Sequence, residues 1–116
     1  MPNVISEHDL QNSIRLKLSE MGYCVFRANV GKFQTKDGRW FDTGLPKGFS
    51  DLFAIKNGTI SFIEVKAETG KPTKEQLNFI KQMKETYGCN AGIARSVEDA
   101  VRIVEGERKH EHEHET

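Results

Sequence analysis

The sequence predicts an α/β fold with a mixed central β-sheet flanked by helices, its elements in the order α-β-β-β-α-β-α. An Asn57-Gly58 pair between two apolar runs predicts a two-residue hairpin, because both central residues of a type I′ turn need positive φ. Apolar residues at helical spacing follow three good N-cap residues, Ser6, Thr73 and Ser96. The second hairpin strand, a helix and a further strand succeed one another, which favours a parallel crossover onto the same sheet.

The first helix is expected to begin after Ser6 and to end at Gly22, a residue type suited to a helix C-terminus. Residues 23–30, YCVFRANV, are β-branched and aromatic, and they predict a strand that pairs with the hairpin. The helix positions expected to face the core are Leu10, Ile14, Leu18 and Met21.

A long polar stretch, residues 31–48, separates that strand from the hairpin, and in so small a domain such a connection is usually functional or disordered. Its basic and aromatic residues together suit a nucleic-acid surface, where cations neutralise phosphates and rings stack on bases. An Ω-type loop whose aromatic rings pack onto the core is the alternative, and both interpretations stay open. With Arg27 at its approach, the stretch holds Lys32, Lys36, Arg39 and Lys47, interleaved with Phe33, Trp40 and Phe41.

The second helix is expected to begin with a capping box formed by Thr73 and Gln76, and to end at Gly88. The capping box explains Gln76 structurally, so a chemical role for it needs other grounds. Residues 89–95 predict a short strand between helices, and Ser96 begins the third helix. The expected core positions are Leu77, Ile80, Met83 and Tyr87 on the second helix, and Val97, Ala100, Val101 and Val104 on the third.

A length of 116 residues suits one domain, which we place at residues 1–106. The formal net charge is zero, but residues 107–116 hold four glutamates against two basic residues, so the remainder carries +2. The alternating HEHEHE ending has no means of packing and is interpreted as a purification tag or a disordered tail. We recognise no secretory signal and no membrane-spanning apolar run, and we expect Cys24 and Cys89 to be buried, reduced thiols; these features predict a cytoplasmic protein.

The hairpin carries the residues with the clearest chemical meaning. With a two-residue turn, the register places Asp51 opposite Glu64, and strand alternation puts Lys66 on the same face. Two adjacent carboxylates repel each other, and a divalent cation such as Mg²⁺ or Mn²⁺ between these hard oxygen ligands would remove the repulsion. The alternative is a pair of solvated strand residues matched to nearby lysines. Apolar residues on both faces of the hairpin predict burial and argue against that alternative.

Two further groups are expected near this pair. The Val65 side chain would point to the other face, leaving its carbonyl oxygen as a third metal ligand. Glu7 would complete the shell if the first helix begins beside the outer end of the hairpin; its structural alternative is a favourable interaction with the helix dipole. Lys66 would orient a water or stabilise charge in the transition state of phosphodiester hydrolysis.

Asp51 followed by Glu64-Val65-Lys66 resembles the PD-(D/E)xK nuclease signature, with Ser50 where that pattern has proline. The bare pattern is weak because it arises by chance in many proteins.

The surrounding sequence is more similar to one branch, the VRR-NUC domain in its small, stand-alone, virus-type form. The resemblance runs from Ser6 to about Val104, and the extended match with the following glutamine is specific. It begins at the helix start at Glu7 with Gln11 and Ile14, and continues through FRANVGKF, TGLPKGFSDLFAI, FIEVKAETGKPTKEQLNFI and ARSVEDAV.

This resemblance implies a restriction-endonuclease-like fold similar to that of Holliday-junction resolvases. It implies a Mg²⁺- or Mn²⁺-dependent endonuclease that acts as a homodimer on branched DNA such as Holliday junctions or flaps, inside the host cell if phage-encoded. The metal ligands would be Asp51, Glu64 and the Val65 carbonyl, supplemented by Glu7; Lys66 would be the catalytic lysine, with Gln76 facing the site. The candidate nucleic-acid-binding residues are Arg27, Asn29, Lys32, Arg39, Lys47, Lys71 and Lys74.

Two other functions stay open. A non-catalytic nucleic-acid-binding module could retain the nuclease fold. A phosphohydrolase of small nucleotides is a further alternative, although the chain lacks a glycine-rich phosphate cradle.

Overall fold

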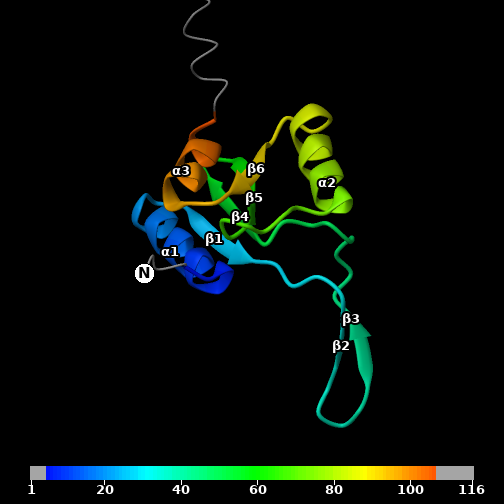
Figure 1. Ribbon diagram of the computed structural model, residues 1–116. Coiled ribbons are helices and arrows are strands. Elements are labelled where there is room, and N and C mark those ends of the chain that lie inside the picture. Colours follow the sequence, from blue (N-terminus) through cyan, green and yellow to red (C-terminus); the bar gives the residue numbers. More distant parts are fainter. Residues whose placement is uncertain (1–4, 107–116) are drawn as a thin grey trace, which may run out of the picture.

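A four-stranded mixed sheet between helices forms the centre of the computed structural model, which describes residues 5–106 (Figure 1). The expected tail or tag at residues 107–116 lies outside the described residues. The elements are α1 (Glu7–Glu20), β1 (Cys24–Arg27), β2 (Lys32–Gln34), β3 (Trp40–Asp42), β4 (Leu52–Lys56), β5 (Thr59–Val65), α2 (Lys74–Glu85), β6 (Asn90–Ala94) and α3 (Val97–Glu105).

The central sheet has the strand order β1-β4-β5-β6. β1 and β4 are antiparallel, as are β4 and β5, whereas β5 and β6 are parallel and are connected through α2. The predicted fold class and the parallel crossover are therefore confirmed. The predicted element order was incomplete, because the long stretch 31–48 contains β2 and β3, which form a separate two-stranded ribbon.

The β4–β5 hairpin has the register that the Asn57-Gly58 turn predicts. Asn57 has φ of 53° and Gly58 has φ of 78°, and Lys56 pairs with Thr59 on either side of them. Pairing continues to Leu52 and Ile63, so the next position along the ladder holds Asp51 and Glu64. The two-residue turn thus sets which side chains share a face at the far end of both strands.

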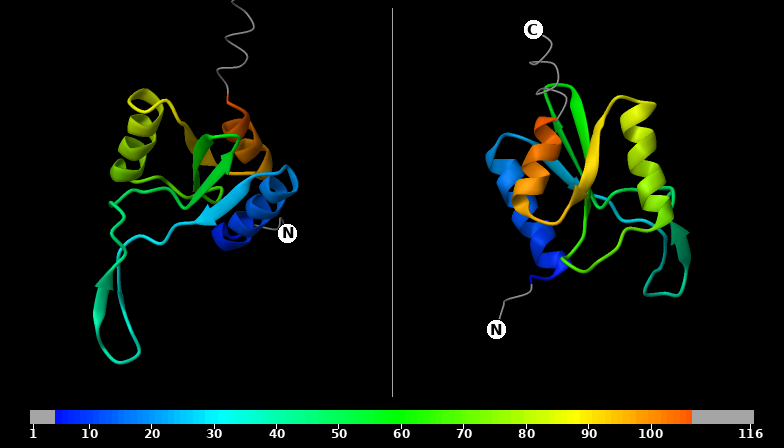
Figure 2. Two further views of the ribbon diagram at one scale, coloured as in Figure 1. Left: turned by 180° about the vertical axis from the view of Figure 1, so that it is seen from behind. Right: turned by 45° about the horizontal axis from the view of Figure 1, so that its top comes forward.

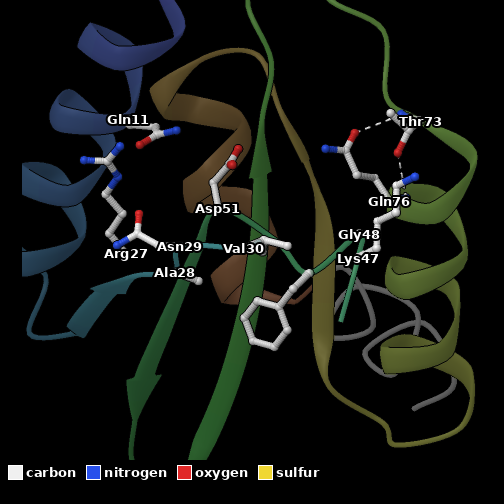
Figure 3. A pocket seen from close by; sticks show the side chains of 11 residues that line it. Gln11, Arg27, Ala28, Asn29, Val30, Lys47, Gly48, Asp51, Thr73 and Gln76 are labelled. Atoms are coloured by element: carbon white, nitrogen blue, oxygen red, sulfur yellow. Dashed lines mark hydrogen bonds between the residues drawn. The ribbon is translucent and has the colours of Figure 1, made fainter. Parts of the chain in front are cut away.

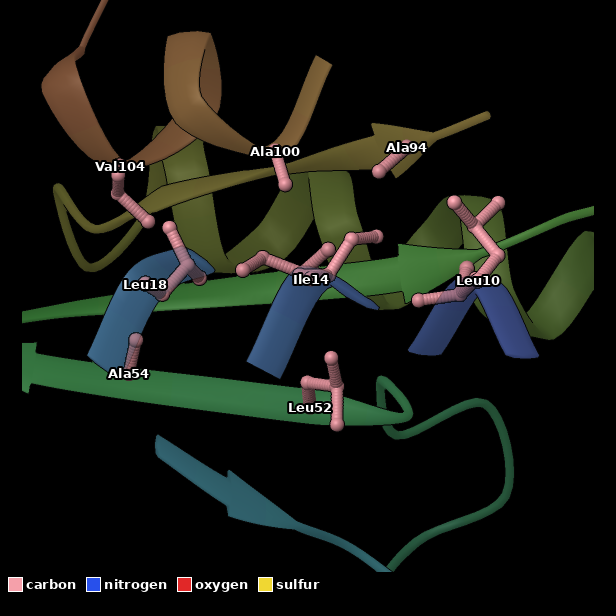
Figure 4. Packing of buried hydrophobic residues seen from close by; sticks show 10 residues of the cluster. Leu10, Ile14, Leu18, Leu52, Ala54, Ala94, Ala100 and Val104 are labelled. Carbon is pink, nitrogen blue, oxygen red and sulfur yellow. The ribbon is translucent and has the colours of Figure 1, made fainter. Parts of the chain in front are cut away.

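Two apolar clusters pack on the two faces of the sheet. α1 and α3 cover one face, and α2 covers the β5–β6 part of the other (Figure 2). The first cluster joins α1, α3, β4, β5 and β6, and Figure 4 shows its side chains converging between these layers. Ile14, Leu18, Leu52 and Ile63 are fully buried there. The second cluster centres on Phe62 and Phe79, whose rings meet edge to face with centroids 5.3 Å apart.

The predicted core positions of α1 and α3 are confirmed, because Leu10, Ile14 and Leu18 on α1, and Ala100 and Val104 on α3, are buried, with Met21, Val97 and Val101 packed against them.

The prediction for α2 was wrong at two positions. Leu77 is 48% exposed and Tyr87 is 63% exposed, and the helix ends at Glu85 rather than at Gly88. The helix packs through Phe79, with Ile80 and Met83 beside it. Leu77 is two residues before Phe79, about 200° around the helix from it, and so it faces away from the sheet.

Cys24 corrects another expectation, because it is exposed. Cys24 lies on β1, which is an edge strand. The helix α2 contacts β5 and β6, towards the opposite edge of the sheet, and so leaves Cys24 in solvent. Cys89 is half-buried. None of the helices within residues 5–106 is both long and apolar enough to cross a membrane.

Candidate active site

Asp51 stands immediately before β4 and is held from two sides by backbone groups. Its carbonyl oxygen accepts a hydrogen bond from the Ala28 N–H at 2.8 Å, which extends the β1–β4 pairing by one residue. Its Oδ2 accepts from the Val65 N–H at 2.9 Å, across the hairpin. These contacts fix the carboxylate beside the end of β5, where Glu64 lies.

Glu64 is a buried carboxylate, and one of its oxygens is unsatisfied. It is 1% exposed, and its Oε1 has no hydrogen-bond partner among the described residues. Burial, and then the charge of nearby Asp51, raise the pKa of Glu64 to about 8, while the Lys66 ammonium acts in the opposite direction. The alternative of a solvated strand carboxylate is therefore wrong for Glu64.

Lys66 lies on the same face, with its Nζ 3.7 Å from Glu64 Oε2 and its side chain 13% exposed. Its backbone N–H donates to the Ala94 carbonyl at 3.0 Å, so β6 holds the lysine's backbone in place. Val65, between the two charged residues, is fully buried in the core on the opposite face, as strand alternation requires.

Glu7 begins α1 and reaches the chain just after β5. Its Oε2 accepts from the Ala67 N–H at 3.4 Å. The same oxygen lies close to Gly70, where an added Cβ would come within 3.0 Å of it. Within residues 5–106, no group of three or more acidic, histidine or cysteine side chains is positioned to hold a metal ion. The acidic site as it stands is the Asp51–Glu64 pair, and a ligand role for Glu7 stays a prediction.

A cleft of about 370 Å³ opens beside Asp51 (Figure 3). It brings together three of the candidate nucleic-acid-binding residues, Arg27, Asn29 and Lys47, with Asp51 and Gln76. These residues come from β1, from the segment after it, from the approach to β4 and from α2, so only the folded chain assembles them.

Gln11 also lines this cleft, and it was missing from the predicted site residues. It lies near Arg27 in Figure 3. Its position four residues after Glu7 puts both side chains on the same face of α1, and that spacing is the signal that could have found it.

The wall formed by α2 depends on a close backbone approach. Gly48 has φ of 93°, and a Cβ on it would lie 2.4 Å from the Glu75 carbonyl oxygen. Thr73 and Gln76 form the predicted capping box, with hydrogen bonds of 2.9 and 3.1 Å (Figure 3). Gln76 is thus a cap and a cleft residue at once.

The remaining candidate nucleic-acid-binding residues do not line the cleft. Lys71 and Lys74 are exposed at the start of α2. Lys32 lies on β2, and Arg39 precedes β3, where its Nε is 3.0 Å from Asp37 Oδ2.

Comparison with solved structures identifies the fold. A structure described as a VRR_NUC domain superposes with a TM-score of 0.62, covering 88% of this chain and 97% of that chain at 23% sequence identity. The chain has the fold of a VRR-NUC domain. No protein-family profile and no curated protein matches the sequence.

This likeness in fold confirms the structural part of the resemblance seen in the sequence. The structure also shows the environment of Ser50, the position at which the sequence departs from the nuclease signature. Ser50, which replaces the usual proline, is fully buried, and its Oγ has no hydrogen-bond partner within residues 5–106.

Proposed function

We propose that this chain is a metal-dependent endonuclease that hydrolyses phosphodiester bonds in branched DNA such as Holliday junctions or flaps. The observation that carries the proposal is the buried Glu64 carboxylate, which lies beside Lys66 and next to Asp51 at the end of the hairpin. Asp51 in turn lines the cleft that holds basic residues, whereas Glu64 and Lys66 are not among its lining residues. Buried titratable groups with strongly shifted pKa values, gathered at a cleft, are typical of active sites.

The donor set fits a divalent cation. Glu64 Oε1 is buried without a partner, and the charge of Asp51 disfavours ionisation of Glu64. A cation bound by both carboxylates would satisfy that oxygen and remove the repulsion. Mg²⁺ and Mn²⁺ suit oxygen ligands, and Mg²⁺ usually keeps several waters, so two carboxylates are an adequate protein contribution. When bound, such an ion would polarise a phosphoryl oxygen and lower the pKa of a bound water.

The protein's own side chains would position the water and bind the phosphates. Lys66, on the same face and next to Glu64, would hold the attacking water or stabilise negative charge on the phosphoryl oxygens. Arg27 and Lys47 in the cleft would bind phosphates on either side of the cleaved bond. Gln76 would orient a phosphate or water by hydrogen bonding from the start of α2.

A homodimer would present two such sites to a branched substrate. An apolar region of the sheet supports this part of the proposal. β1 and β4 leave Phe26 43% and Ile55 38% exposed on the face that α2 covers only in part, and Phe26 stacks on Phe53 with centroids 5.0 Å apart. Association of two copies through that face would remove these side chains from water.

The test is a cleavage panel of single-stranded, duplex, flap and four-way-junction DNA, with Mg²⁺ or Mn²⁺. We expect nicking of the branched substrates that requires the metal and is lost in Asp51→Ala, Glu64→Ala and Lys66→Ala. Glu20→Ala, an exposed glutamate on α1, is the matched control and should cleave normally. Cleavage that survives Glu64→Ala would refute the assigned site, and binding without cleavage under every condition would favour the non-catalytic module. Light scattering of the purified protein measures whether it is a dimer.

A further inference from the structure

The β2–β3 ribbon is an arm that projects from the body of the domain (Figures 1 and 2). We define the arm as residues 31–44, closed at its base by a hydrogen bond of 3.0 Å from the Thr43 N–H to the Gly31 carbonyl. A two-stranded ribbon with three residues in each strand is marginally stable by itself. Val30, immediately before the arm, and Lys47, three residues after its end, both line the cleft.

The end of the arm has a defined conformation. The Thr35 N–H donates to the Arg39 carbonyl at 2.7 Å, and the Gln34 side chain donates to the Gly38 carbonyl at 3.1 Å. Gly38 has φ of 90° and turns the chain between them. A preformed loop loses little conformational entropy when it binds a partner.

The charges of the arm favour an anionic partner. Its two carboxylates are engaged within the arm: Asp37 with Thr35 and Arg39, and Asp42 Oδ1 as acceptor from the Gly44 N–H at 2.8 Å. Two arm lysines, Lys32 and Lys36, are exposed and make no ion pair with any residue in the range 5–106.

Trp40 is the decisive residue. It is the single tryptophan of the chain, and it is 67% exposed on the arm, which excludes the alternative of an Ω-type loop that tucks this ring onto the core. The register pairs Trp40 with Gln34 and Lys32 with Asp42, so alternation places Lys32 on the same face as Trp40. An exposed ring beside a free cation is the combination with which proteins bind single-stranded nucleic acid, by stacking and phosphate neutralisation.

We propose that the arm is a second DNA-contacting surface, separate from the cleavage cleft, in which Trp40 stacks on an unpaired base of the substrate. A base inside a duplex is stacked on both faces, whereas an unpaired base offers a free face to the ring. Trp40 is three residues from the base of the arm at Thr43, a span of roughly 10 Å at the rise of a strand, or about three nucleotide steps. The arm therefore selects DNA that has unpaired nucleotides a few positions from the bond in the cleft.

This inference rests on the proposed action on DNA, and the single tryptophan allows a test that does not depend on cleavage. The full chain, in EDTA, is titrated with a duplex that carries a short unpaired flap and with the same duplex fully paired. Trp40 emission is followed together with the anisotropy of dye-labelled DNA. We expect saturable quenching with the flap substrate and much less with the paired duplex.

Trp40→Ala should weaken binding of the flap substrate by roughly five- to a hundredfold and leave duplex binding nearly unchanged, and Trp40→Phe should recover part of the loss. Tyr87→Ala, which removes a ring of similar exposure from the segment after α2, is the matched control and should bind normally. Binding of flap DNA with no change in Trp40 emission would overturn the proposal, as would emission that changes with protein concentration and not with DNA, because the arm would then contact a second copy. Quenching in a protein that never cleaves would leave the arm assignment standing and refute the nuclease function.

Discussion

Replacing Glu64 with glutamine tests the physical basis of the site before any cleavage is measured. Glu64→Gln keeps the shape and the buried position of the side chain while removing its ability to ionise. In the folded protein, burial and the charge of Asp51 raise the pKa of Glu64 from its ordinary value of 4.5 to about 8. The wild-type protein must therefore either keep a proton on Glu64 or bury a charge.

The sign and the size of the effect follow from linkage. Because the folded-state pKa is above the unfolded value, the native state binds this proton more tightly than the unfolded chain does. The associated stability is fully present below about pH 4.5 and is lost as the pH rises through about 8. At about 1.4 kcal/mol per pH unit, the gap between the two values corresponds to about 5 kcal/mol, a large share of the roughly 5–15 kcal/mol that stabilises a typical domain.

Urea denaturation in EDTA, between about pH 5 and about pH 9, measures this effect. The free energy of unfolding of the wild type should fall relative to that of Glu64→Gln as the pH rises, with the largest difference near the upper end. Glu20→Gln, which removes an exposed carboxylate from α1, should follow the wild-type pH dependence. Parallel curves for the wild type and Glu64→Gln would refute the idea that a buried, perturbed carboxylate lies at this site. In a second series at about pH 8, Mg²⁺ or Mn²⁺ should raise the stability of the wild type and not that of Glu64→Gln.

Substitutions at three further positions, Gly48, Lys66 and Gln76, test the site and its surroundings. Gly48→Ala should destabilise the fold by about 2 kcal/mol or more, because a Cβ at φ of 93° would lie 2.4 Å from the Glu75 carbonyl oxygen. The control is Gly44→Ala, which should cost only about 1 kcal/mol because Gly44 has φ of 82° but open space around it. Equal losses of stability for the two variants in thermal unfolding would contradict this account. Lys66→Met should reduce single-turnover cleavage by at least a hundredfold while leaving the dissociation constant for DNA within about threefold, and a loss confined to binding would remove the lysine from the chemical step. Gln76→Ala should lower stability by about 0.5–1 kcal/mol through loss of the capping box, whereas Gln76→Glu keeps the box; a cleavage defect in both variants would separate the role of Gln76 in the cleft from its role as a cap.

Local signals in the sequence predicted most of the central fold. N-caps at Ser6, Thr73 and Ser96 begin the three helices as expected, because a capping hydrogen bond depends only on residues within one turn. The register of the hairpin followed from Asn57-Gly58, because a two-residue turn leaves one way to pair the strands. The packed face of α2 was mispredicted. Phe79 is inside and Leu77 is outside because of the strands that the helix covers, and the sequence does not show which strands those are.

The ribbon β2–β3 escaped prediction because its strands are three residues long and are interrupted by polar residues, so neither periodicity nor an apolar run marks them. The cleft was equally out of reach. Gln11, Arg27 and Gln76 are far apart in the sequence, and they converge because α1, β1 and α2 pack around the end of one hairpin.

The sequence by itself determined the chemistry that is available at this site: two carboxylates and a lysine, placed on one face by a turn that leaves a single register. The tertiary structure decided how those groups behave. Burial of Glu64 in the folded domain removes water from it, and a carboxylate without water beside another carboxylate holds its proton to a higher pH. Burial is a property of all the layers together, and for that reason no local pattern in the sequence could supply it.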